Sequence, residues 1–232
     1  MRLDKLIADC GKGSRKEIKL QLRRGAASVN GEIVKNGDFK VDENADEVYF
    51  LGEKLNYRKF VYLMLNKPGG VVSATYDNRD STVVSLIDEE YSNYKLFPVG
   101  RLDKDTEGLL IITNDGETAH RLLAPKSHVN KRYYAETDSE IPHSAVQRFK
   151  DGITLDDGYV TLPAKLEIIT PHSAYVTICE GKFHQVKRMF ADVGCKVVYL
   201  KRVNFGDLPL DDELKPGEYR ELSAEEIKIL IK

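Results

Sequence analysis

The sequence predicts an α+β protein, with a small N-terminal α/β module followed by a larger domain on a mixed, mainly antiparallel sheet. Helical and hairpin patterns fill the first 52 residues, a polar stretch covers residues 53–59, and apolar strand-like segments dominate from residue 60. The strands expected there outnumber the helices and do not alternate regularly with them, which favours an α+β fold. We therefore expect domains at residues 1–52 and 60–232, joined by a linker at residues 53–59.

The N-terminal module should contain two short helices and a hairpin. Apolar residues recur at helical spacing over residues 3–10. A second helix begins at Ser14, with Glu17 three residues later, which is a capping-box pattern. The pair Asn30-Gly31, flanked by β-branched residues, is a strong signal for a tight hairpin.

The second helix carries a basic face, because Arg15, Lys19 and Arg23 are spaced by four residues. Basic helix, hairpin and short β ending follow one another in an order that resembles the alpha-L, or S4-like, RNA-binding domain shared with a small-subunit ribosomal protein. The resemblance covers about residues 1–50. It implies RNA binding through this helix face and the hairpin.

The second domain has strand and helix patterns along its whole length. Strands are expected at residues 60–65, 96–102, 108–113, 131–137, 164–170, 173–180 and 196–206. Helices are expected at residues 82–87, from Asp115 to 124, at 139–152 with Pro142 in the first turn, and at 184–193, with a last strand and helix within 218–231.

The composition limits the class of protein. Hydrophobic residues make up 41% and charged residues 31%, and no apolar run approaches the ~20 residues of a membrane helix. The charged N-terminus does not fit a signal peptide. The three cysteines form no CxxC pair, which disfavours structural zinc and disulfides. We expect a cytoplasmic protein without a membrane partner.

The charge distribution is uneven along the chain. Residues 1–24 hold eight basic and three acidic residues, and residues 180–204 hold six and two. Basic islands of this kind on a chain of net charge −2 can bind phosphate locally. Solvated helix faces explain the same pattern, so charge alone leaves both interpretations open.

An acidic loop at residues 98–115 has three possible roles. The stretch DKDTEG at residues 103–108 imitates the start of a calcium loop. Its twelfth position is Asn114, which cannot supply the closing bidentate carboxylate, so we expect no calcium here. A magnesium site on two carboxylates, a plain turn between strands, and a loop presenting one catalytic acid all stay open on the residues alone.

Four motifs decide between these roles. They are GRLDKDTEGLL at residues 100–110, LNKPGGVVSAT at 65–75, KRYYAE at 131–136 and EGKFHQVKRMF at 180–190. Together they resemble the RNA pseudouridine synthases, in the order found in the ribosomal small-subunit pseudouridine synthase A family and its large-subunit relatives. The resemblance spans almost the whole chain. It implies a pseudouridine synthase catalytic domain that acts on ribosomal RNA, with 16S rRNA expected and 23S rRNA as the alternative.

The resemblance also implies the chemistry. A uridine N-glycosidic bond breaks, the uracil turns, and a C–C bond forms to the same sugar carbon, so no cofactor is expected. Asp103 occupies the catalytic aspartate position, Lys187 matches the basic residue that pairs with it, and Tyr133 matches the tyrosine that would hold the flipped-out base. Asp105 and Glu107 are expected to brace the loop.

Further RNA contacts are expected around these three residues. The resemblance gives Arg101 a place near the gap that the flipped base leaves. Lys67, in the NKPGG turn, and His184 and Arg188, which flank Lys187, complete the expected RNA-binding set.

Other interpretations of the same residues exist. Without the resemblance, Lys187 would be a solvated surface lysine and Tyr133 one of 12 tyrosines. By strand alternation Tyr134 should point away from Tyr133, into the core. A non-catalytic rRNA-binding or assembly factor and a metal-dependent hydrolase are the competing functions. The presence of Asp103, Tyr133 and Lys187 together favours the enzyme, which we expect to be a monomer.

Overall fold

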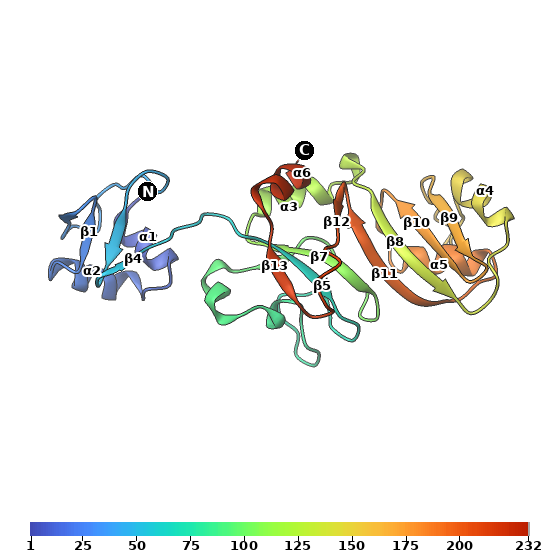
Figure 1. Ribbon diagram of the computed structural model, residues 1–232, viewed down its shortest axis with the longest axis horizontal. Helices are drawn as coiled ribbons and strands as arrows, with labels where there is room; N and C mark the ends of the chain where they lie inside the picture. Colours follow the sequence, from blue (N-terminus) through green and yellow to red (C-terminus); the bar gives the residue numbers. More distant parts are fainter. Residues whose placement is uncertain (232) are drawn as a thin grey trace. The chain divides into compact units, whose positions relative to one another are not determined.

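The computed structural model describes residues 1–231 and divides into two compact units (Figure 1). One unit contains residues 1–61 and 89–95, and the other contains residues 62–88 and the chain from residue 96 onward. The membership of residues 89–95, which form the short helix η2 (Glu89–Tyr94), was not expected from the sequence. Within the described residues no helix is long and apolar enough to cross a membrane.

The N-terminal unit packs two helices against a small sheet. The sheet has the strand order β2-β1-β3-β4, and every pairing in it is antiparallel. The capping box predicted for the second helix is confirmed, because Ser14 and Glu17 exchange both of its hydrogen bonds. The elements are α1 (Leu3–Asp9), α2 (Arg15–Arg23), β1 (Ala27–Val29), β2 (Glu32–Ile33), β3 (Val48–Phe50) and β4 (Glu53–Lys54).

The larger unit is built on a nine-stranded sheet, whose main path runs β13-β5-β7-β11-β8-β10-β9, with β6 on β7 and β12 on β11. Only β7 and β11 pair in parallel among the strands described, so the prediction of a mixed, mainly antiparallel sheet is confirmed. The strands are β5 (Tyr62–Lys67), β6 (Phe97–Pro98), β7 (Glu107–Thr113), β8 (Lys131–Thr137), β9 (Lys165–Thr170), β10 (Ser173–Ile178), β11 (Val197–Phe205), β12 (Leu208–Pro209) and β13 (Tyr219–Glu221).

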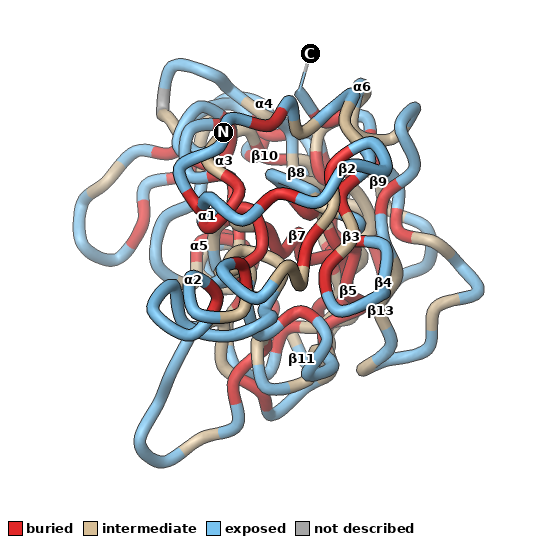
Figure 2. The backbone as a smooth tube through the Cα atoms, turned by 90° about the vertical axis from the view of Figure 1, so that its left-hand side faces the viewer, coloured by how far each residue is buried: buried red, intermediate tan, exposed pale blue. Residues whose placement is uncertain are grey.

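Helices cover this sheet at several points. Apolar residues of α3 and α6 join a core with buried residues of β5 and β7, and both strands are mostly buried in Figure 2. The helix α4 lies beside β9 (Figure 1). The helices are α3 (Gly116–Leu123), α4 (Ser144–Asp151), α5 (Gln185–Asp192) and α6 (Ala224–Ile231), with the short helices η1 (Val84–Leu86) and η3 (Pro125–Ser127).

The helix predicted over residues 139–152 begins later than expected. The helix α4 starts at Ser144, so Pro142 precedes it instead of occupying its first turn. The reason is a tertiary contact: the backbone N–H of Ile141 donates to the carbonyl of Pro171 at 2.7 Å, which ties this segment to the turn between β9 and β10.

One glycine permits the parallel contact that shapes the site. Gly108 on β7 has a φ of +98°, and a Cβ there would lie 2.2 Å from the carbonyl oxygen of Arg202 on β11. Any other residue would push the two strands apart. Gly108 therefore fixes the acidic loop, which ends at β7, against β11.

Candidate active site

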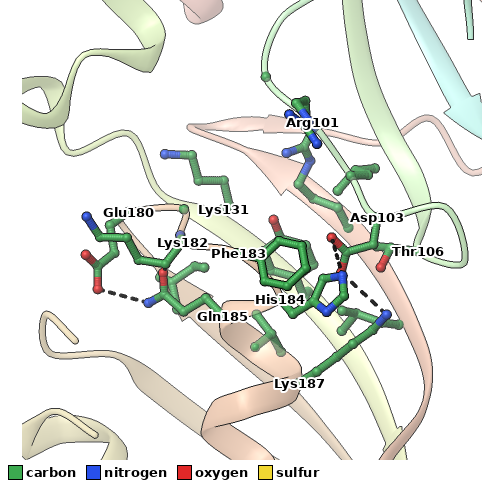
Figure 3. Close-up of a pocket in the computed structure, with 18 of the residues that line it drawn as sticks. Arg101, Asp103, Thr106, Lys131, Glu180, Lys182, Phe183, His184, Gln185 and Lys187 are labelled. Atoms are coloured by element: carbon green, nitrogen blue, oxygen red, sulfur yellow. Dashed lines mark hydrogen bonds and ion pairs between the residues drawn. The ribbon is translucent and has the colours of Figure 1, made fainter. Parts of the chain in front are cut away.

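A pocket of about 410 Å³ opens where the acidic loop meets β8, β11 and the start of α5 (Figure 3). This volume lies within the ~300–1,000 Å³ typical of ligand sites. Asp103, Tyr133 and Lys187 all line it, although they come from three separate segments of the chain. The structure thus brings together the three residues that the sequence nominated as catalytic.

Asp103 lies on the turn of the acidic loop with its oxygens accessible. Its backbone carbonyl accepts a hydrogen bond from the N–H of Thr106, which closes the turn. The nearest basic groups are the ammonium of Lys187, 3.4 Å from Oδ2, and Nε2 of His184, 3.6 Å from Oδ1 (Figure 3). No group of the described chain donates a hydrogen bond to this carboxylate, whose side chain is 27% exposed. Its lone pairs are therefore available to a ligand.

Lys187, on the first turn of α5, lies between two carboxylates. Its ammonium donates to Oδ1 of Asp105 at 2.5 Å and lies 3.4 Å from Asp103. The hydrogen bond from Lys187 holds the pKa of Asp105 below its usual value. Asp105 thus anchors the lysine beside Asp103, while Glu107 accepts a hydrogen bond from the hydroxyl of Tyr199 at 2.8 Å.

Lys67 supports the acidic loop from inside the protein. Its side chain has no exposed surface, and its ammonium donates to the carbonyls of Pro68 at 3.0 Å, Lys104 at 3.2 Å and Thr106 at 2.8 Å. Burial lowers its pKa to about 8. The side chain gives no support to the prediction that Lys67 contacts RNA, because the fold encloses it and uses its three protons.

Tyr133 and Tyr134 alternate across β8 as predicted. Tyr133 is 8% exposed, lines the pocket and is the cross-strand partner of Arg202 on β11. Tyr134 lies on the other face, but it is only half-buried, with its hydroxyl donating to Glu136 at 2.9 Å. The expectation that Tyr134 belongs to the core is wrong. Neighbouring polar groups satisfy its hydroxyl near the surface.

The segment before α5 presents an aromatic pair at the pocket. Phe183 is 72% exposed and stacks on the His184 ring, with centroids 3.8 Å apart (Figure 3). Phe183 was not predicted from the sequence as part of the site. The available signal was an aromatic residue inside the polar motif EGKFHQ.

Arg188 holds this segment in place. Its guanidinium forms ion pairs with Asp156 and with Asp157, which lies 2.8 Å away. Its Nη1 also donates a hydrogen bond to the carbonyl of Phe183 at 3.3 Å. Its side chain is 16% exposed. The prediction that Arg188 binds RNA is not supported, because two carboxylates from a distant loop already neutralise it.

Arg101 lines the pocket and is exposed. Within residues 1–231 it has no hydrogen bond or ion pair. It therefore keeps all its donors for a ligand.

The basic face of α2 has a carboxylate partner of its own. Arg15 donates to Asp4 at 2.9 and 3.0 Å, and Lys19 lies 3.6 Å from the same carboxylate. Arg23 is exposed and has no partner among the residues described. The three side chains on this face therefore differ in how free they are to bind phosphate.

In the described part of the chain, no group of three or more His, Cys, Asp or Glu side chains could hold a metal ion. Asp103 and Asp105 face an ammonium group, which occupies the place between them that a cation would need.

Comparisons with known proteins identify the family of the chain. The family model described as RNA pseudouridylate synthase matches residues 61–192, and the S4 domain model matches residues 1–46. An uncharacterized RNA pseudouridine synthase of Bacillus subtilis is 50% identical, covering 99% of this chain and 98% of its own length. The ribosomal small subunit pseudouridine synthase A of Escherichia coli K12 is 41% identical over the full length of both chains.

A solved structure also matches the fold of the whole chain. A crystal structure of a pseudouridylate synthase, 40% identical, superimposes over 100% of both chains with a TM-score of 0.71. The fold class and the family resemblance predicted from the sequence are confirmed. The chain belongs to the RNA pseudouridylate synthase family and carries an S4 domain at its N-terminus.

Proposed function

We propose that the protein converts a uridine of 16S ribosomal RNA to pseudouridine, with Asp103 as the catalytic carboxylate. The observation that carries the proposal is an accessible carboxylate, 3.4 Å from an ammonium, in a pocket of about 410 Å³. None of residues 1–231 donates a hydrogen bond to it. The small-subunit target is supported by relatives named ribosomal small subunit pseudouridine synthase A, 42% identical in Yersinia pestis and 41% in Escherichia coli.

The proposed reaction is balanced within one nucleotide. The C1′–N1 bond breaks and its electron pair stays on the uracil. The uracil turns, C5 bonds to C1′, C5 loses its proton and N1 gains one. Asp103 stabilises the cation-like sugar carbon or bonds to it, as carboxylates do in glycoside hydrolysis. Attack of Asp103 on the base is the alternative.

The surrounding residues take supporting roles. Lys187, with His184 beside it, positions Asp103 and places a positive charge 3.4 Å from its carboxylate. Tyr133 on the pocket wall offers its ring to the extruded base. Arg101 and the exposed part of the α2 face bind RNA phosphates. The proposed enzyme is a cytoplasmic monomer and requires no cofactor.

The test follows the C5 proton. A 16S rRNA transcript carrying tritium at C5 of uridine is incubated with the protein in the presence of EDTA. We expect release by the wild type and none by Asp103→Asn. A 23S transcript and a small-subunit assembly particle run in parallel identify the substrate.

Each other outcome points to another function. Tight binding of the transcript by the wild type without tritium release would overturn the enzyme and leave an RNA-binding factor. Release that depends strictly on a divalent ion at the chemical step would favour a metal-dependent mechanism. Release from the 23S transcript alone would overturn the 16S target.

A further inference from the structure

The pocket also contains a buried arginine. Arg202, on β11, lines the pocket and is 2% exposed. Its Nε donates to the carbonyl of Leu109 at 2.8 Å, but its Nη2 is shielded from solvent and has no hydrogen-bond partner among residues 1–231. No carboxylate of the described chain pairs with it.

This arrangement of Arg202 is unfavourable unless a ligand supplies the missing hydrogen-bond acceptors. A guanidinium remains charged at every physiological pH, and a buried charge without a partner is strongly destabilising. Lys67, the other buried cation near the loop, shows the usual solution, since three carbonyl oxygens receive its protons. Arg202 has one such acceptor where its guanidinium could use several.

Lys131 lies at the same end of the pocket. Residues 131 and 205 are cross-strand partners, and the Phe205 ring has the Lys131 ammonium 5.8 Å from its centroid and the Arg202 guanidinium carbon 5.2 Å from it. Burial, and next the charge of Arg202, lower the pKa of Lys131. Two cations therefore share one aromatic ring, and neither forms an ion pair with a carboxylate of the described chain.

The position of Arg202 selects the part of the RNA that it can reach. It is the cross-strand neighbour of Tyr133, so the two side chains stand side by side on one face of the sheet. A base stacked on Tyr133 would present its edge to Arg202. Phosphates of a polymeric chain stay near the exposed rim, where Arg101 lies (Figure 3).

We propose that Arg202, with Lys131 beside it, binds a carbonyl oxygen of the extruded uracil and stabilises the negative charge that the base acquires when the glycosidic bond breaks. This inference rests on the proposed function. When C1′–N1 breaks, the bond's electron pair is delocalised over N1, O2 and O4 of the uracil. A guanidinium donor at O2 or O4 holds that charge without transferring a proton. The pair is consumed again when C5 bonds to C1′.

The experiment is a cycle between protein and substrate. Single-turnover formation of pseudouridine is measured for the wild type and Arg202→Met, on RNA with uridine, 2-thiouridine or 4-thiouridine at the target position. Sulfur accepts hydrogen bonds poorly, so each thio substitution weakens one contact. Arg202→Lys, which keeps the charge, should recover part of the rate.

We expect Arg202→Met to slow the uridine reaction by about 100-fold, the cost of losing one donor to a developing anion. At either O2 or O4, replacing oxygen by sulfur should slow the reaction of the wild type. The same replacement should change the rate of Arg202→Met by less than about threefold, because the contact is already lost. If the rate losses from Arg202→Met and from the thio substitution simply multiply at both O2 and O4, the inference is overturned. Coupling to a methylphosphonate at the target phosphate, in place of a thio position, would assign Arg202 to the RNA backbone and also overturn it.

Two controls keep the outcome readable. The wild type is assayed first on unmodified RNA: absence of product defeats the proposed function, whereas product with multiplicative cycles defeats only this inference. If Arg202→Met does not fold, the same cycle is run with Arg202→Lys and with Lys131→Met, and the same criterion applies.

Discussion

Asp4 in the N-terminal unit and Asp103 in the pocket are both carboxylates with basic side chains beside them. They differ in whether the protein donates hydrogen bonds to their oxygens. Asp4 is fully buried and accepts hydrogen bonds from Arg2 at 2.8 and 3.0 Å and from Arg15 at 2.9 and 3.0 Å. Burial opposes its ionisation, but these hydrogen bonds outweigh burial and lower its pKa to about 2. Asp103 is partly exposed and lies 3.4 Å from the ammonium of Lys187 and 3.6 Å from Nε2 of His184.

The difference separates a structural ion cluster from the one that we propose to be reactive. The carboxylate of Asp4 has its acceptor capacity filled by the fold, and it holds α1 and α2 together. The carboxylate of Asp103 is kept near positive charge with its lone pairs free, which is the state that a group needs if it is to approach a sugar carbon. The same distinction applies to cations, since Arg15 has an internal partner and Arg101 has none in the described chain.

Among the neighbours of Asp103, Lys187 should have the largest effect when it is removed. Lys187→Met removes the nearest cation from Asp103, and we expect single-turnover pseudouridine formation to fall by about 100-fold. Asp105→Asn is the matched control, because it removes a carboxylate that touches the same ammonium. It should cost less than about tenfold, an effect on positioning alone. Equal losses in the two variants would show that Lys187 acts only through Asp105.

The comparison extends to buried cations, and the pH dependence of the unfolding free energy tests it at Lys67. Its folded pKa of about 8 lies below the usual 10.5, so the unfolded chain binds more protons between these values and the unfolding free energy rises with pH across that window. The wild type should gain roughly 1–3 kcal/mol relative to Lys67→Met between pH 8 and pH 10.5, measured by denaturant titration. A difference that stays constant or decreases over this range would contradict the burial of a charged lysine.

The smallest effects are expected on the α2 face. Arg23→Ala removes an unpaired cation and should weaken binding of the RNA a few-fold, reducing the slope of log K against log salt by roughly 0.7. Arg15→Met removes a cation already paired with Asp4, so it should change the salt slope less and local stability more. The measurements are RNA titrations at several salt concentrations, with hydrogen exchange of α1 and α2 amides. The opposite ranking of the two variants would contradict the comparison.

The sequence predicted the features whose signals are local. The capping box of α2, the Asp115 cap of α3 and the segments of the sheet all follow from neighbouring residues. The motif around Asp103 likewise identified the acidic loop.

Features that depend on distant segments were missed. Lys67 meets carbonyls nearly 40 positions away, and Arg188 meets carboxylates 31 and 32 positions away. The burial of Arg202 follows from the parallel pairing of β7 with β11, which no local pattern encodes. Basic residues in a motif can therefore serve the fold or the ligand, and only their tertiary partners distinguish the two.

The most direct measurement compares single-turnover pseudouridine formation by Asp103→Asn and Asp4→Asn at saturating enzyme, with hydrogen exchange of α1 and α2 as the stability readout. Asp103→Asn should lose at least about 10³-fold in rate and leave the exchange unchanged. Asp4→Asn should speed the exchange, through a loss of roughly 2–4 kcal/mol in local stability, and keep the rate within about tenfold of the wild type. An Asp103→Asn variant that forms product at a rate near that of the wild type would contradict the account.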